Sequence, residues 1–287
     1  MIESRGEKIF YGCNYVLLSL IALATLYPFL YVLSASISSP EAVVTGEVLL
    51  FPKNLTIEAY QAVFAEKEMW SGYANTIFYT VVGTLTSMAF TICGAYALSK
   101  KRLFGRTFFN LLISFTMVFQ AGMIPTYLNF RDLDLLDTRT GIILGFAITT
   151  YNVIILRAFF QSIPEEIEEA ARIDGASEAG VLFRVVLPLS KAAIATITLF
   201  YAVSRWNGYF WAMILLKDTD KIPLQVLLNR LVVQMKPSDT MLMDSAFSIG
   251  ETIIYATIIV AVIPIVIVYP FIQKYFVKGV MIGSLKG

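Results

Sequence analysis

The sequence predicts an all-α integral membrane protein with six transmembrane helices, and its composition and charge distribution support this fold class. Of the 287 residues, 57% are apolar and 15% are charged, and the mean hydropathy is +0.71. A soluble domain usually carries about 25% charged residues, because its surface must face water. The charges are also unevenly placed and leave long charge-free segments. Such segments suit a bilayer, since a charge at its centre costs roughly 2.5–3.5 kcal/mol.

The predicted spans are the segments that approach the length a bilayer requires, about 20 apolar residues per helix. The shortest, 141–156, is expected to borrow a turn from its flanks. Another, 192–216, contains Arg205 as its one charged residue. We therefore expect spans within residues 9–40, 69–99, 107–130, 141–156, 192–216 and 252–273.

The distribution of lysine and arginine predicts the orientation in the membrane. These residues concentrate in segments 1–11, 99–107, 157–191 and 274–287, and are fewer in 38–70, 128–139 and 217–248. The short loop 99–107 contains Lys100, Lys101, Arg102 and Arg106 and no acid. Because cytoplasmic loops are enriched in basic residues, both termini are predicted to be cytoplasmic. No soluble linker interrupts the chain, so we expect a single membrane domain over 1–287, with a cytoplasmic loop at 161–191 and a tail at 274–287.

The loop 161–191 differs from the segments around it. Ser162, Pro164 and Glu165 predict a helix start with a capping box, and the helix is expected to run to Ile173. Asp174-Gly175 predicts a break, because Gly adopts the left-handed conformation at little cost. A second amphipathic helix is expected from Ala176, ending at Leu187-Pro188. This helix–elbow–helix suits either an interfacial helix lying on lipid or a helix that docks into a groove of a partner protein. The apolar face of the second helix comprises Val181, Leu182, Val185 and Val186.

The residues of this loop resemble the coupling loop of permeases in bacterial ATP-binding-cassette importers. The similar residues are Glu169-Ala170-Ala171-Arg172-Ile173-Asp174-Gly175-Ala176, then Phe183 and Leu187-Pro188-Leu189. Further segments are similar to the carbohydrate-uptake branch of these permeases, the branch of the second maltose permease. They are Pro52-Lys53-Asn54-Leu55-Thr56, Asn75-Thr76, Met123-Ile124-Pro125, Leu156-Arg157-Ala158-Phe159-Phe160, Arg205-Trp206-Asn207-Gly208 and the end Gly283-Ser284-Leu285-Lys286-Gly287.

The resemblance implies a multi-pass subunit of the bacterial cytoplasmic membrane. Its implied partners are a second, non-identical permease, two ATPase subunits, an extracytoplasmic solute-binding protein and a carbohydrate substrate, most simply an oligosaccharide. ATP and Mg would belong to the ATPase, and this chain would hold no cofactor and catalyse no reaction. Consistent with that, the sequence contains no G-x-x-x-x-G-K-[ST] phosphate loop. ATPase closure would drive alternating access through the coupling residues Glu169, Ala170, Ala171, Asp174, Gly175, Ala176, Phe183, Leu187 and Pro188.

Five residues within the predicted spans are candidates for the substrate pathway. An intramembrane arginine such as Arg205 usually faces a cavity or an internal partner, so a structural role is equally consistent. Aromatic residues near it can stack on sugar rings or form an interfacial belt. Asparagine side chains can bind hydroxyl groups or join helices by hydrogen bonds. The candidates are Asn152, Arg205, Trp206, Asn207 and Tyr209.

Other functional classes fit the sequence less well. An ion-coupled secondary transporter would be expected to carry acidic residues within its spans, and the six segments contain none. The chain has no histidine and no cluster of metal ligands, which disfavours a membrane enzyme or a metal site. A net charge of +1 without a long basic run gives no reason to expect nucleic acid. An importer permease for a solute other than a sugar remains an alternative.

Overall fold

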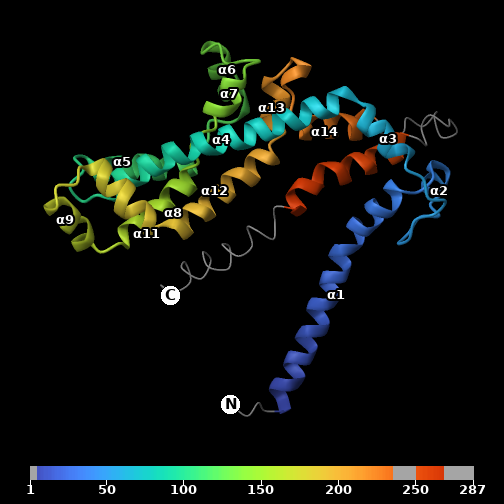
Figure 1. The fold of residues 1–287 in the computed structure, drawn as a ribbon, viewed down its shortest axis with the longest axis horizontal. Coiled ribbons are helices and arrows are strands. Elements are labelled where there is room, and N and C mark those ends of the chain that lie inside the picture. The colour runs from blue at the N-terminus through green and yellow to red at the C-terminus, as the bar shows by residue number, and fades with distance from the viewer. Residues whose placement is uncertain (1–4, 235–249, 268–287) are drawn as a thin grey trace. The chain divides into compact units, whose positions relative to one another are not determined.

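The computed structural model describes residues 5–234 and 250–267, and the regular structure within these ranges is entirely helical (Figure 1). The chain divides into two compact units, each described by itself below. One comprises residues 1–69 and 228–264, and the other residues 70–227 and 265–287. The predicted tail 274–287 and residues 235–248 of the predicted outer loop 217–248 lie outside the described residues.

The first unit contains α1 (Arg5–Ser36), α2 (Pro40–Val44), α3 (Glu58–Ala65) and most of the helix Gly250–Ile267. Apolar side chains are exposed along most of α1, which is the arrangement expected of a helix that faces lipid or another chain. Its small core is built from Ala35, Ala42, Val43 and Val48. Just before α3, the Thr56 hydroxyl accepts a hydrogen bond from the Glu58 amide at 3.2 Å.

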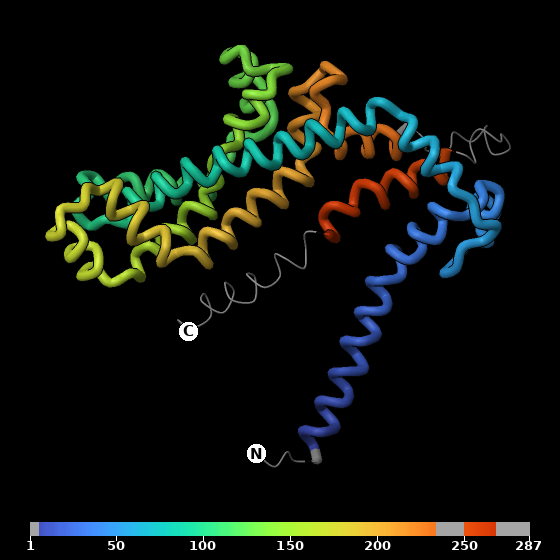
Figure 2. The backbone as a smooth tube through the Cα atoms, in the orientation of Figure 1, coloured from blue at the N-terminus to red at the C-terminus, as the bar shows by residue number. Residues whose placement is uncertain are grey.

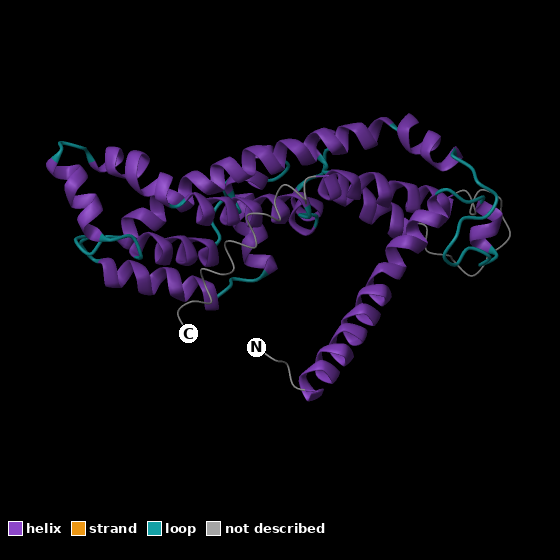
Figure 3. Ribbon diagram, turned by 60° about the horizontal axis from the view of Figure 1, so that its bottom comes forward, coloured by secondary structure: helices purple, strands orange, loops and turns teal. Residues whose placement is uncertain are grey.

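The second unit is built around α4 (Lys67–Ser99), a helix without interruption that can be followed in Figure 2. Shorter helices follow it in the sequence, and Figure 3 shows them joined by brief loops. They are α5 (Arg106–Val118), α6 (Met123–Asp132), α7 (Arg139–Leu144), α8 (Thr150–Gln161), α9 (Glu165–Ile173), α10 (Glu178–Val181), a π-helical turn (Leu182–Val186), α11 (Leu187–Leu189), α12 (Lys191–Trp206), α13 (Phe210–Leu215), a 3₁₀ turn (Thr219–Lys221) and α14 (Leu224–Gln234), whose last residues belong to the first unit.

Three of the six predicted spans are single long helices within the described residues. These are α1, α4 and Gly250–Ile267. The other three are broken: 107–130 bends by 118° between α5 and α6, 192–216 stops at Trp206 and resumes at Phe210, and 141–156 is divided between α7 and α8. A second bend of 86° separates α11 from α12. Counting each bent pair once gives up to five spans among the described residues.

Local residue choices explain these breaks. Gly122 has φ +81°, a conformation that favours glycine, and it directly precedes α6. Pro125 lies in the first turn of α6, where its missing N–H has no helical partner to lose. Asn207 and Gly208 follow Trp206, and both are poor helix formers. Hydropathy alone therefore located the apolar segments and missed their interruptions.

A buried apolar core joins α4, α8, α12 and the segment Glu178–Leu189. Phe160, Leu156, Val181, Val186 and Ile197 are all nearly or fully buried. Of the predicted apolar face of the second loop helix, Val181, Leu182 and Val186 belong to this core and Val185 is half-buried. That face is directed into the protein, so the loop 161–191 is fixed to the second unit by its own apolar side.

Candidate functional site

The loop 161–191 folds as two short helices separated by an elbow. α9 and α10 occupy the expected places, and Gly175 between them has φ +84°. Two details differ from expectation. The Ser162 hydroxyl donates to the Phe159 carbonyl and ends α8 instead of capping α9, whose N-cap position is Pro164. Pro188 lies within the first turn of the short helix α11 and does not end the segment, since proline is tolerated where no amide hydrogen bond is required.

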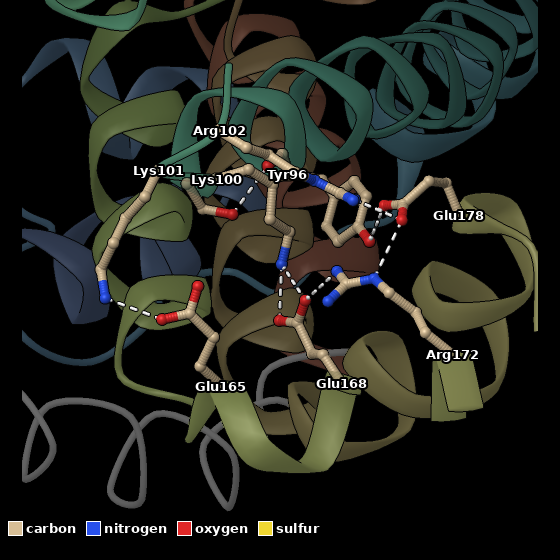
Figure 4. A network of polar contacts seen from close by, with 9 residues as sticks. Tyr96, Lys100, Lys101, Arg102, Glu165, Glu168, Arg172 and Glu178 are labelled. Carbon is tan, nitrogen blue, oxygen red and sulfur yellow. Dashed lines mark hydrogen bonds and ion pairs between the residues drawn. The ribbon is translucent and has the colours of Figure 1, made fainter. Parts of the chain in front are cut away.

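An ion-pair network ties α9 to the loop that follows α4 (Figure 4). The Lys100 ammonium lies 2.5 Å from the Glu168 carboxylate, and Glu168 is 4% exposed. Arg172, one turn further along α9, also donates to Glu168, at 3.1 Å. The same ammonium lies 4.2 Å from the ring centroid of Tyr96, a cation–π geometry. Glu168 is therefore a buried carboxylate held by two cations, one from each side of the junction.

A second carboxylate, Glu178 at the start of α10, completes the network. It accepts a hydrogen bond from the Tyr96 hydroxyl at 3.1 Å and pairs with Arg172 at 3.0 Å. Arg102 forms a further ion pair with it. The hydrogen bond from Arg102, together with those from Arg172 and Tyr96, lowers the pKa of Glu178 to about 2. The carboxylate therefore stays ionised, and the pairs persist at every pH near neutrality.

A third pair lies at the edge of the network. Lys101 and Glu165 are 2.7 Å apart and both are largely exposed, so solvent screening makes the contribution of this pair to stability small. The hydrogen bond between them raises the pKa of Lys101 and lowers that of Glu165. A cavity of about 730 Å³ opens beside the network, bordered by Arg106, Gln161 and Glu166 among others.

The predicted coupling residues separate into an outward and an inward set. Ala171, Ala176 and Leu187 are half-buried and pack against the core of the unit. Phe183 is 65% exposed, and the nearby Ile173 is 86% exposed. The remaining coupling residues are exposed: Glu169, Ala170, Asp174, Gly175 and Pro188. No hydrogen bond or ion pair engages the Glu169 carboxylate within the described part of the chain.

The predicted substrate-pathway residues are only partly brought together. A cavity of about 470 Å³ lies between α7, α12 and α13, and Arg205, Asn207 and Tyr209 line it. Trp206 does not line it, since it lies about 100° round the helix from Arg205. Asn152 is buried on α8 away from the cavity. Seven other lining residues are aromatic or carry a hydroxyl group: Tyr79, Phe146, Thr149, Tyr201, Ser204, Phe210 and Trp211. The rest of the lining is Ile142, Gly145, Ile148, Gly208, Ala212 and Pro223.

Arg205 is engaged by protein groups at the cavity wall. Its guanidinium donates to the carbonyls of Ile142 at 2.6 Å, Ile143 at 3.0 Å and Phe146 at 2.7 Å. It also donates to the Ser87 hydroxyl of α4 at 3.3 Å. The carbonyls of Ile142 and Ile143 belong to the last turn of α7 and that of Phe146 to the residue after its C-cap, where backbone acceptors lack helical partners. These contacts favour a structural role for Arg205, in which backbone carbonyls accept its hydrogen bonds instead of an acidic side chain.

Sequence reasoning missed several residues of the ion-pair network. The sequence patterns single out neither Glu168 nor Glu178, include Arg172 only in the family resemblance, and use Lys100 and Arg102 only as indicators of membrane orientation. Complementary charge is nevertheless visible in the sequence, since the acid-free basic loop 99–107 and the four glutamates at 165, 166, 168 and 169 both lie in segments predicted to be cytoplasmic. Asn75 was noted only as part of a family resemblance. In the structure its amide donates to the carbonyl of Asp220 at 2.8 Å and that of Ile222 at 3.2 Å.

Comparison with known proteins matches the sequence of this chain to a family. The model of the family described as "Binding-protein-dependent transport system inner membrane component" matches residues 1–282. The "Polygalacturonan/rhamnogalacturonan transport system permease protein YtcP" of Bacillus subtilis (strain 168) is 44% identical over 98% of this chain and 99% of that protein. "Protein LplC" of the same organism is 41% identical over 100% and 98%.

A solved structure is also similar along nearly the whole chain. It is that of a bacterial ABC transporter involved in the import of the acidic polysaccharide alginate. The matching chain is 49% identical, and the match covers 96% of this chain and 99% of that chain with a TM-score of 0.89. The resemblance predicted from the loop motifs is confirmed by these matches.

Proposed function

Because the chain belongs to the family of binding-protein-dependent transport system inner membrane components, a family of multi-pass membrane permeases, we propose that it forms half of the membrane pore of an ATP-driven carbohydrate importer. It crosses the membrane six times with both termini in the cytoplasm. Its partners are a second, non-identical permease, two ATPase subunits that bind ATP and Mg, and an extracytoplasmic solute-binding protein. The chain itself hydrolyses nothing and works by alternating access.

The observation that carries this proposal is the outward face of α9 and the elbow. Ile173 is 86% exposed beside Gly175, and the Glu169 carboxylate is exposed with no ion pair among the described residues. A short helix with an apolar tip and a free acid suits insertion into a groove of another protein. The opposite side of α9 is fixed by Glu168, so the helix is held with its outward face free to dock.

The cavity beside α12 supports a carbohydrate as the solute. It is lined by aromatic rings, including Tyr209, Phe210 and Trp211, and by hydroxyl and amide groups such as Ser204 and Asn207. Aromatic faces and hydrogen-bonding groups are the usual partners of sugar rings and their hydroxyls. The relatives are named for polygalacturonan, rhamnogalacturonan and alginate. We therefore propose an oligosaccharide, and oligosaccharides of uronic acids are the first to test.

Affinity purification of the tagged chain from its native membrane tests the proposal. We expect a second permease and a soluble ATPase to purify with it. Glu169→Gln removes the free charge of the docking face and should reduce recovery of the ATPase. Glu58→Gln is the matched control, because it removes an equally exposed carboxylate from the predicted extracytoplasmic side.

The possible results separate the two functional classes. Recovery of both partners, with ATPase recovery reduced by Glu169→Gln but unchanged by Glu58→Gln, supports the importer. Recovery of the chain alone, with solute flux driven by an ion gradient, would establish a secondary transporter instead.

A further inference from the structure

We propose that the ion pairs of Lys100 and Arg102 make α4 the element that carries movement of the docking helix to the cavity. This inference rests on the proposed function and adds positioning residues to it. The flanking elements α8 and α12 are continuous in sequence with the loop 161–191. α4 is joined to the loop only through space.

The end of α4 next to the loop is fixed to both loop helices. Lys100 directly follows α4 and binds both carboxylate oxygens of Glu168 on α9, each at 2.5 Å. Tyr96, in the last turn of α4, donates its hydroxyl to Glu178 at 3.1 Å. Arg102 pairs with the same carboxylate. Because these bonds are directional and the Lys100–Glu168 pair is mostly buried, displacement of α9 cannot leave α4 in place without separating charges.

The middle and far parts of α4 reach the cavity wall. The Thr91 hydroxyl is 2.7 Å from that of Tyr201, and Ser87 is 3.3 Å from Arg205. Tyr201 and Arg205 both line the cavity, as does Tyr79 of α4 itself. From Ser99 to Tyr79 the helix is unbroken, and 1.5 Å per residue gives a rigid element about 30 Å long. One helix therefore contacts the docking loop at one end and the cavity along its length.

The connections through the chain are less direct. α8 ends at Gln161, before the Ser162–Pro164 link to α9. On the other side, an 86° bend separates α11 from α12. Apolar contacts in the shared core hold these elements together, but such contacts are non-directional. The charged contacts to α4 specify a single arrangement of α9 relative to the cavity.

The test uses the complete transporter in proteoliposomes, with its partner permease, ATPases and solute-binding protein, and measures solute imported per ATP hydrolysed. Lys100→Met removes the direct ion pair between α9 and the end of α4 while Arg172 still neutralises Glu168, so α9 keeps its own ion pair. We expect the ratio to fall about fivefold or more. Lys101→Met is the matched control, since the Lys101–Glu165 pair is exposed. Lys100→Arg keeps the charge and should retain most of the ratio.

Each outcome decides a separate claim. Failure of the unaltered complex to import carbohydrate with ATP contradicts the proposed function. An unaltered complex that imports, with Lys100→Met and Lys101→Met giving equal ratios, overturns the role of α4. If Lys100→Met does not assemble, Arg102→Met decides, because it removes the ion pair with Glu178 while Arg172 still pairs with that carboxylate. A lowered ratio in that variant supports the inference, and an unchanged ratio overturns it.

Discussion

Arg205→Lys distinguishes a structural from a substrate-binding arginine at the cavity. The guanidinium donates to three carbonyls at or just after the end of α7, those of Ile142, Ile143 and Phe146, and to Ser87. Lysine retains the positive charge but replaces a planar fork of donors with a single ammonium. That group can reach one or two of these acceptors, so about two hydrogen bonds are lost. At about 1–1.5 kcal/mol each, the expected loss of stability is about 2–3 kcal/mol.

The assay is thermal unfolding of the purified protein in detergent, with ligand binding measured alongside. A loss of 2–3 kcal/mol corresponds to a Tm lowered by about 4–12 °C in a chain of this size. The reasoning is refuted if Arg205→Lys unfolds within about 2 °C of the unaltered protein while solute binding is lost. That result would show that the guanidinium serves the substrate and that the carbonyls are satisfied without it.

Three further predictions follow from local geometry. Gly175→Val should strain the elbow by about 1–2 kcal/mol and reduce transport, because φ at this position is +84°. The membrane fold should survive, because a Cβ there meets no atom within 4 Å. Gly175→Asn, which tolerates positive φ, should transport, and normal transport by the valine variant would contradict the assignment. Gly145→Ala should lower Tm, because the added Cβ would lie 2.0 Å from Cζ of Phe130. Gly94→Ala is the control, because a Cβ at position 94 meets no atom within 4 Å and should not lower Tm. Equal Tm values for the two variants would refute the prediction. Since the pKa of Glu178 falls from 4.5 to about 2 on folding, its contribution is full above about pH 4.5 and lost as pH falls towards 2. The Tm difference between the unaltered protein and Glu178→Gln should therefore stay constant near neutral pH and shrink only in acid, and a change between about pH 6 and 8 contradicts the sign.

The sequence was sufficient to predict the apolar helices and the position of the elbow. α1 and α4 follow from charge-free segments, because hydropathy reports the surrounding medium directly. The break at Gly175 follows from a residue whose conformational freedom is encoded locally. The interruptions of 107–130 and 192–216 were not predicted, since Gly122 and Asn207-Gly208 are short signals inside long apolar windows.

The ion-pair network and the cavity depend on which segments meet in space. Lys100 and Glu168 are far apart in sequence, and only the packing of α9 against the end of α4 brings them together. Arg205 and Asn207 both line one cavity, whereas Asn152 on α8 does not line it. A single sequence shows which residues are charged, but not which of them will form ion pairs in the folded protein.

The central claim, that this permease imports carbohydrate by ATP-driven coupling, is tested most directly by uptake into proteoliposomes. The purified complex with its ATPases inside is supplied externally with solute-binding protein and a labelled uronic acid oligosaccharide. The account predicts uptake that requires internal ATP, is reduced in Gly175→Val, and is unaffected when ionophores collapse all ion gradients. Uptake that proceeds without ATP and disappears with the ion gradient would contradict it.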